Sequence, residues 1–206
     1  EWREAVDACD SDAGALHRAW IDFVLKEFLE YEDRVLLRGE SVPEALSLPV
    51  AEHGGKVRPG MAVMKGDSPQ LLIDVLPPDT DLESIRSYEG WNTSALDRMV
   101  ALCRGAKVTI GLLTNGERWL VVHVPEGGTV GHASWYGRIW RPEPVTLRAF
   151  QTLLGVRRCF GPQDKTLPAL LSASLEYQDE VTDTLGQQVR RAVEVLIQSL
   201  DRADQD

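Results

Sequence analysis

Residues 107–124 read KVTIGLLTNGERWLVVHV, and this stretch decides the fold. Two apolar runs, 107–114 and 117–124, flank Asn115 and Gly116. An Asn-Gly pair between such runs is a strong signal for a β-hairpin, because both residues accept the positive φ angles of a two-residue primed turn. The stretch therefore predicts two antiparallel strands joined by a tight turn at Asn115 and Gly116.

The rest of the chain places helices and strands around this hairpin. Helices are predicted over 15–30, 93–104, 146–154 and 167–201, strands over 61–64 and 71–76, and an edge strand or irregular cover over 132–140. The segment 32–60 is polar and interrupted by proline and glycine, which predicts a connecting loop with one short helical turn. A helix crossover before an antiparallel hairpin predicts an α/β fold with mixed strand directions and a C-terminal helical extension.

The charge of the chain is unevenly distributed. The net charge is -10, yet residues 97–158 hold nine Lys and Arg against four Asp and Glu. Strong non-specific DNA binding by such an acidic chain is not expected, but a local basic face can contact phosphates. The candidate phosphate contacts are Arg98, Arg104, Lys107, Arg138, Arg141, Arg157 and Arg158. The alternatives are a solvated face and a contact with other domains. Near two of these arginines, the aromatic residues Trp135, Tyr136 and Trp140 predict either base stacking or cover for the sheet edge.

Several classes of protein and site are not expected from the sequence. The chain has no apolar run near membrane-spanning length and no signal-peptide pattern, which predicts a cytoplasmic piece of a larger protein without a membrane partner. The four histidines lack HExxH spacing and the three cysteines lack CxxC spacing, so no metal site is expected from them. No phosphate-binding P-loop, serine elbow or Gly-rich methyltransferase cofactor turn is found, so this piece is not expected to bind a cofactor or transfer methyl groups itself.

The order of elements and the T-N-G-x-x-W corner, formed by Thr114, Asn115, Gly116 and Trp119, carry a family resemblance. The chain resembles the PD-(D/E)xK nuclease-like domain at the start of type I restriction subunits and of large type IIG-like or phage-defence (DISARM- or BREX-like) DNA adenine methyltransferases. The match spans roughly residues 15–160 in outline. It implies a restriction-endonuclease-like mixed sheet flanked by helices over 1–160 and a helical extension over 161–206 that links to a methyltransferase domain. The implied partners are DNA, bound through the parent protein, and the remaining domains or defence-system subunits. S-adenosylmethionine would be the cofactor of the parent chain.

In that family, cleavage requires two carboxylates that bind Mg²⁺ and a lysine that stabilises developing charge. Where the family has Pro-Asp, this chain has Pro59-Gly60. Where the family has acid-x-Lys, the chain has Asp74-Val75-Leu76. One carboxylate therefore remains, whereas its partner acid and the lysine are missing.

Other residues are candidates for the missing charges. Lys65, Asp67 and either Glu27 or Glu30 would complete a Mg²⁺ site if the catalytic groups had migrated. Three hypotheses follow from the sequence. The chain is a degenerate, non-cleaving domain that holds DNA or docks against a methyltransferase; or it is an active Mg²⁺-dependent endonuclease; or it is a pure interaction and regulatory module.

Overall fold

The computed structural model describes residues 2–8, 12–50, 55–88 and 91–203. The chain divides into two compact units, Glu1–Pro162 and Gln163–Asp206. The division falls two residues after the boundary expected at 160. The candidate site lies in the first unit.

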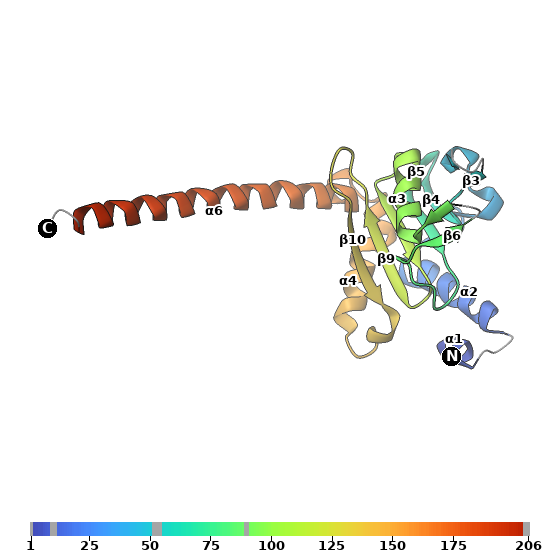
Figure 1. Cartoon of the computed structure of the whole chain (residues 1–206). Helices are drawn as coiled ribbons and strands as arrows, with labels where there is room; N and C mark the ends of the chain where they lie inside the picture. Colours follow the sequence, from blue (N-terminus) through green and yellow to red (C-terminus); the bar gives the residue numbers. More distant parts are fainter. Residues whose placement is uncertain (1, 9–11, 51–54, 89–90, 204–206) are drawn as a thin grey trace. The chain divides into compact units, whose positions relative to one another are not determined.

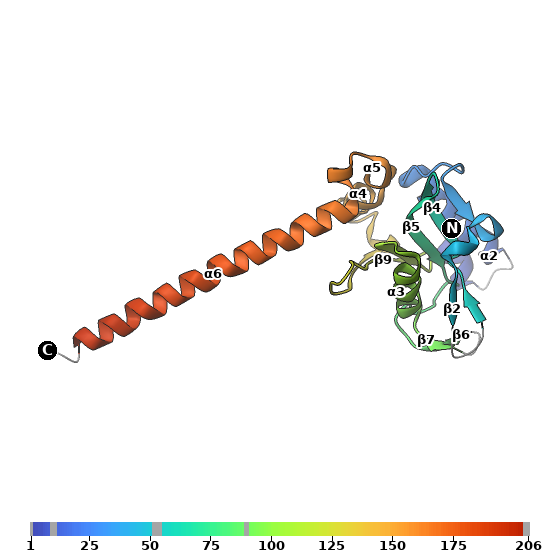
Figure 2. The same cartoon turned by 90° about the horizontal axis from the view of Figure 1, so that it is seen from above.

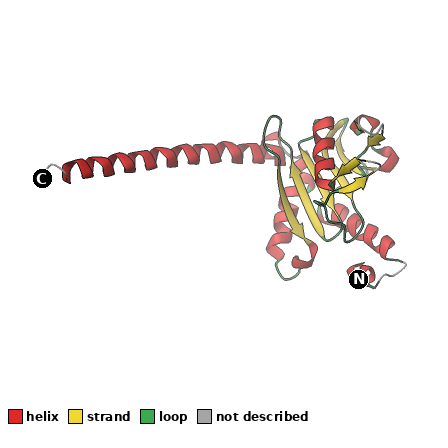
Figure 3. Cartoon of the chain, in the orientation of Figure 1, coloured by secondary structure: helices red, strands yellow, loops and turns green. Residues whose placement is uncertain are grey.

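The first unit is built on a six-stranded sheet with the order β1-β4-β5-β8-β9-β10. Figures 1 and 3 show this sheet with the helices beside it. Strands β1, β4 and β5 form an antiparallel meander, β8 pairs parallel to β5, and β9 and β10 continue antiparallel. Their bounds are Leu36–Arg38, Met61–Lys65, Ser68–Val75, Ile110–Thr114, Arg118–His123 and Gly131–Tyr136. The fold is thus α/β with a restriction-endonuclease-like mixed sheet flanked by helices, which confirms the prediction.

Helices cover the two faces of this sheet (Figure 2). Helix α3 (Ala95–Ala106) makes the crossover from β5 to β8 and begins at Ser94, whose hydroxyl accepts a hydrogen bond from the backbone N–H of Asp97. Leu72 of β5 packs with Met99 of α3 in one core cluster, whereas its neighbour Ile73 points to the other face.

The opposite face is covered by helix α2 (Ala13–Phe23), which continues as a π-helix (Val24–Phe28) where the sequence predicts one helix over 15–30. At the β10 edge of the sheet lie a 3₁₀ turn (Gly137–Ile139) and the helices α4 (Pro144–Leu154) and α5 (Val156–Phe160). The strand expected within 132–140 is β10, an edge strand of the sheet.

The segment 32–60 is more structured than predicted. It contains β1, two 3₁₀ turns (Gly39–Ser41 and Glu44–Leu46) and a two-stranded ribbon of β2 (Leu48–Val50) and β3 (Gly55–Val57). A second ribbon, β6 (Arg86–Tyr88) with β7 (Trp91–Thr93), and helix α1 (Trp2–Asp7) were also not predicted. Three-residue strands are too short for an apolar period to appear in the sequence, which explains why these strands were not predicted.

The second unit consists of a 3₁₀ turn (Gln163–Lys165) and helix α6 (Leu167–Ala203). The helix matches the segment predicted over 167–201. Within the described ranges, no helix of the chain combines the length and the apolar character needed to cross a membrane.

Candidate functional site

The one carboxylate expected at the nuclease-like centre, that of Asp74, forms an ion pair with an arginine. Asp74 is the second-to-last residue of β5, and its side chain points to the face that α3 covers. Its Oδ2 accepts a hydrogen bond from Nη2 of Arg98 on α3 at 2.9 Å. The two side chains are only 16% and 8% exposed, respectively. The Arg98 guanidinium also lies 4.1 Å from the ring centroid of Tyr88, which covers it.

The two positions that lack catalytic groups lie beside this ion pair. A Cβ built on Gly60 would lie 3.1 Å from Oδ1 of Asp74, so the residue after Pro59 does face this carboxylate. The backbone N–H groups of Gly60 and Val75 donate to the carboxylate. Leu76, which stands at the lysine position, lines a cavity next to the pair. The backbone therefore brings Gly60, Asp74 and Leu76 together, and neither Gly60 nor Leu76 carries a group for metal chemistry.

The protonation of Asp74 reflects two opposing effects. Burial raises the pKa of the Asp74 carboxyl group, because desolvation penalises the ionised form. The Arg98 guanidinium and the backbone N–H groups of Gly60 and Val75 lower this pKa, but they offset only part of the effect of burial. Arg98 thus supplies the positive charge that the buried carboxylate requires.

The candidates for migrated catalytic groups do not converge on Asp74. Lys65 and Asp67 lie at the β4–β5 turn, whereas Asp74 is at the other end of β5, about 20 Å along the strand from the turn. Glu27 and Glu30 are exposed, within and just after the π-helix that continues α2 on the opposite face. The structure therefore does not bring Lys65, Asp67 and either Glu27 or Glu30 together with Asp74. Across the residues that the structure describes, no group of three or more His, Cys, Asp or Glu is placed to hold a metal ion.

A cavity of about 290 Å³ opens beside the ion pair. Its wall combines hydroxyl groups with charged and aromatic side chains, including Thr80, Ser84, Arg86, Ser87 and Tyr88. The cavity wall carries charges of both signs, because Asp74 and Asp81 line it together with Arg86 and Arg98. The cavity is polar, but it carries no excess of either charge.

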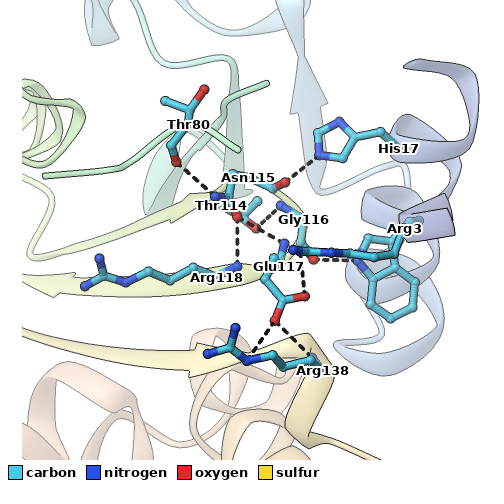
Figure 4. A network of polar contacts seen from close by, with 10 residues as sticks. Arg3, His17, Thr80, Thr114, Asn115, Gly116, Glu117, Arg118 and Arg138 are labelled. Atoms are coloured by element: carbon cyan, nitrogen blue, oxygen red, sulfur yellow. Dashed lines mark hydrogen bonds and ion pairs between the residues drawn. The ribbon is translucent and has the colours of Figure 1, made fainter. Parts of the chain in front are cut away.

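The corner predicted from TNGERW is present, but its turn differs in detail (Figure 4). Gly116 has a φ of +90°, whereas Asn115 is not among the residues with positive φ. The Asn115 side chain instead forms the turn, because its Oδ1 accepts hydrogen bonds from the backbone N–H groups of Glu117 and Arg118 at 3.0 and 2.8 Å. Thr114 Oγ1 accepts a hydrogen bond from the backbone N–H of Gly116 at 2.9 Å. The prediction that Asn115 and Gly116 both take positive φ is therefore wrong for Asn115.

The same corner connects distant parts of the first unit. The Asn115 side-chain amide donates to the carbonyl oxygen of Thr80 at 2.9 Å. From α2, His17 Nε2 donates to the carbonyl oxygen of Asn115 at 2.9 Å, and Trp20 Nε1 donates to that of Gly116 at 2.7 Å. Glu117 accepts from the backbone N–H of Arg138 at 3.2 Å. The corner therefore holds α2, the segment after β5 and the segment after β10 together.

Trp119, the last residue of the corner motif, is a core residue. It is fully buried, and its ring lies 5.5 Å from that of Phe150 and 6.1 Å from that of Trp140, between ring centroids. Trp140, a candidate for base stacking, is itself buried at 6% exposure, and Trp135 lies 5.7 Å from Phe150. Trp135 and Trp140 therefore pack against Phe150 beside the edge strand β10. Tyr136 is half-buried, and the Arg138 guanidinium lies 5.4 Å from its ring centroid.

The seven candidate phosphate contacts do not form one patch. The prediction for Arg98 is wrong, because its guanidinium is buried against Asp74. Arg98 shares the inner stripe of α3 with the buried residues Ala95 and Leu102, so its helical spacing was a signal that it points inward.

The other six candidates occupy three separate places. Arg138 and Arg141 are exposed beside the corner, and the Arg138 guanidinium lies 3.8 Å from Glu117. Arg104 and Lys107 are exposed at the end of α3, at the opposite end of β8 from the corner. Arg157 and Arg158 are on α5, which contacts Leu29 after the π-helix.

Comparison with protein-family models, with curated proteins and with solved structures gives no match to this chain.

Proposed function

We propose that this chain is a non-cleaving, nuclease-like domain of a bacterial DNA methyltransferase, restriction-modification or phage-defence protein. The observation that carries the proposal is the ion pair between Arg98 and Asp74, with Gly60 and Leu76 beside it. Its role would be to help position DNA or to dock against the other domains of a cytoplasmic parent protein. The parent would use S-adenosylmethionine, and this domain would need no cofactor.

The electrostatics support the absence of cleavage. A Mg²⁺ site is normally formed by converging oxygen ligands, and a guanidinium 2.9 Å from the remaining carboxylate repels a divalent cation from the same place. At Gly60 no second carboxylate is available to offset this repulsion. At Leu76 no ammonium group is available to stabilise charge on a phosphate.

Incubation of the purified chain with supercoiled plasmid and Mg²⁺ or Mn²⁺ tests the proposal. We expect no nicking above that of a matched Asp74→Ala variant. Nicking by the wild-type chain that Asp74→Ala abolishes would refute the proposal and favour the endonuclease hypothesis.

A reconstructed centre gives a second test. Gly60→Asp, Leu76→Lys and Arg98→Ala, combined in one variant, restore two carboxylates and a lysine and remove the competing cation. Because Gly60 faces Asp74, we expect this variant to bind Mn²⁺ more tightly than the wild type by isothermal titration calorimetry. The same triple variant with Asp74→Asn is the control, and equal Mn²⁺ binding by the two would show that the positions do not form a centre.

The DNA-positioning role makes a separate prediction. If Arg138 and Arg141 contact phosphates, replacing both by alanine weakens DNA binding and reduces its dependence on salt. Replacing Arg104 and Lys107, at the other end of β8, is the matched control for lost positive charge. An equal effect of the two double variants in fluorescence anisotropy would indicate a net-charge effect without a site beside the corner.

One observation favours the interaction-module hypothesis. Helix α6 exposes Leu185, Val189 and Val193 at 60%, 56% and 47%, and their spacing of four residues places them along one side of the helix. Replacing Leu185 and Val189 by glutamine would then weaken binding to the remaining part of the parent protein, supplied as a separate polypeptide. Unchanged binding in a pull-down with purified components would contradict this hypothesis.

A further inference from the structure

Helix α6 carries an apolar stripe with the spacing of a coiled coil. In the sequence, positions 171, 175, 178, 182, 185, 189, 192 and 196 follow one another at alternating intervals of four and three residues, and six of these eight are Leu, Val or Ala. Such intervals form the heptad repeat of helices that wrap around one another. Leu175, Leu185 and Val189, which belong to this stripe, are 50%, 60% and 56% exposed. The stripe therefore has the pattern of a helix–helix contact but is open to solvent over the middle of α6.

The composition of α6 indicates that this stripe needs a partner. In the described part of the second unit, α6 is accompanied only by the 3₁₀ turn Gln163–Lys165. Gly186 lies near the middle of the helix, and the β-branched residues Thr182, Thr184 and Val189 also lower its helix propensity. Helices in proteins gain most of their stability from the packing of an apolar face. We therefore expect this helix of 37 residues to pack along its stripe against another helix.

The charges of α6 are arranged so that the helix complements a reversed copy of itself. Residues 176–183 contain two Glu and two Asp and no Lys or Arg, whereas residues 184–191 contain two Arg and no Asp or Glu. Two parallel copies in register place their acidic segments side by side, which is repulsive. Two antiparallel copies related by a two-fold axis between residues 183 and 184 place the acidic segment of each copy beside the arginine segment of the other. The charge pattern therefore favours a second copy in the antiparallel orientation.

The same arrangement brings the two stripes together. With the axis between residues 183 and 184, Leu175 lies opposite Ala192 of the second copy, and Thr182 lies opposite Leu185 of the second copy. Each position of the stripe thus faces another position of the stripe, as in the isologous contact of a two-fold dimer. Charge and apolar pattern therefore select the same register.

The stripe is long enough for a stable dimer. At about 1.5 Å per residue, the 37 residues of α6 extend about 55 Å, and a contact strip about 10 Å wide covers roughly 550 Å² on each copy. The pair buries about 1,100 Å² in total, which exceeds the roughly 1,000 Å² expected of a biological interface. No contribution from the first unit is needed to reach this area.

We infer that α6 pairs with α6 of a second copy in an antiparallel coiled coil and makes the chain a homodimer. The inference goes beyond the proposed function, which does not concern the oligomeric state. It assigns to a second copy the face that the interaction-module hypothesis assigns to the rest of the parent protein. The two occupants exclude each other along the stripe, so measurements of mass and of binding distinguish them.

Sedimentation equilibrium of the full chain tests the inference. We expect a species of twice 22.9 kDa that dissociates on dilution. A monomer at every concentration overturns the inference, and a monomer that binds the rest of the parent protein through Leu185 and Val189 identifies that protein as the occupant. Plasmid nicking is measured on the same chain whether it is a monomer or a dimer, so this inference and the proposed function fail separately.

A pair of double variants assigns the contact to the stripe. Leu185→Gln with Val189→Gln is expected to raise the dissociation constant of the dimer at least tenfold, because two apolar side chains are lost from each copy. Thr184→Gln with Glu194→Gln changes exposed residues outside the stripe and is the control, which should leave the dissociation constant within about twofold. Equal dissociation constants of the two double variants overturn the assignment.

Charge exchange tests the orientation. Arg190→Glu with Arg191→Glu places like charges side by side in the antiparallel pair and is expected to weaken the dimer, whereas it would relieve repulsion in a parallel pair. Adding Glu176→Arg with Glu180→Arg exchanges the charges of the two segments and is expected to restore the dimer. A variant that has merely lost its helix would not be restored in this way. A dimer that the first exchange leaves unchanged or strengthens, or that the second does not restore, overturns the antiparallel arrangement.

Discussion

Replacement of Gly116 by alanine tests whether the corner is a structural connection. Gly116 has a φ of +90°, and a Cβ at this position would lie 2.7 Å from His17 Nε2 and 3.1 Å from Trp2 Cη2. An alanine therefore meets two separate obstacles. Its backbone conformation is unfavourable for an L-residue, and its methyl group displaces the α2 side chain that binds the corner.

The magnitude follows from these two contributions. The left-handed backbone conformation costs about 1–2 kcal/mol for a residue with a Cβ. If α2 moves away, the hydrogen bonds from His17 to Asn115 and from Trp20 to Gly116 are lost. Each such bond contributes about 1 kcal/mol net. We therefore expect Gly116→Ala to reduce the free energy of unfolding of the first unit by about 3–4 kcal/mol.

Urea denaturation followed by tryptophan fluorescence measures this loss. All six tryptophans precede residue 163, so the signal reports the first unit alone. Gly127→Ala is the matched control, because Gly127 has a φ of +70° but nothing within 4 Å of an added Cβ. We expect this control to lose only the backbone contribution. If the losses of unfolding free energy in Gly116→Ala and Gly127→Ala agree within about 0.5 kcal/mol, which is the usual additivity error, the corner contacts do not contribute as proposed.

Three further predictions concern buried ionisable groups. Arg98→Met leaves the buried Asp74 carboxylate unpaired and is expected to cost about 3–5 kcal/mol in urea denaturation; adding Asp74→Asn should recover part of this loss, and no recovery would contradict the pairing. Burial lowers the pKa of His17, and also that of His123, so the unfolded chain binds more protons as pH falls below about 6.5. Stability should therefore decrease from pH 7 to pH 5, by at most about 1.4 kcal/mol per pH unit for each histidine, and a His17→Gln variant with an unchanged slope would contradict this. Burial raises the pKa of Cys103 to about 12, so Cys103 should react with a thiol reagent at pH 8 only after unfolding, and Cys103→Ala identifies its share of the labelling in mass spectrometry.

The sequence predicts the main architecture because the long elements carry clear periods. The hairpin at 107–124, helix α3 and the β4–β5 pair are all found where apolar spacing places them. The short strand β1 is held by pairing with β4, which is distant in sequence, so its own residues give little local signal. The two small ribbons pair strands that are close in sequence, but each strand has only three residues, too few to show an alternating apolar pattern.

The candidate site was only partly predictable. That Gly60 and Leu76 carry no charged group can be seen in the sequence, since it requires only the residue types. The partner of Asp74 cannot be chosen in the same way, because nine Lys and Arg lie in 97–158 and charge alone does not distinguish them. Helical spacing does distinguish Arg98, whose position on the inner stripe of α3 indicates a buried partner.

The corner at Asn115 and the Asp74–Arg98 pair are held by different kinds of contact. At the corner, the polar groups of Asn115 are all engaged in hydrogen bonds that join α2, the turn and the loop after β5, so a change there costs stability throughout the first unit. At the centre, the fold requires only that the charge of Asp74 be balanced. A bound cation balances it only when the cation is present, whereas Arg98 is covalently part of the chain and balances it under all conditions. The fold therefore needs no bound cation beside Asp74, because Arg98 supplies the balancing charge.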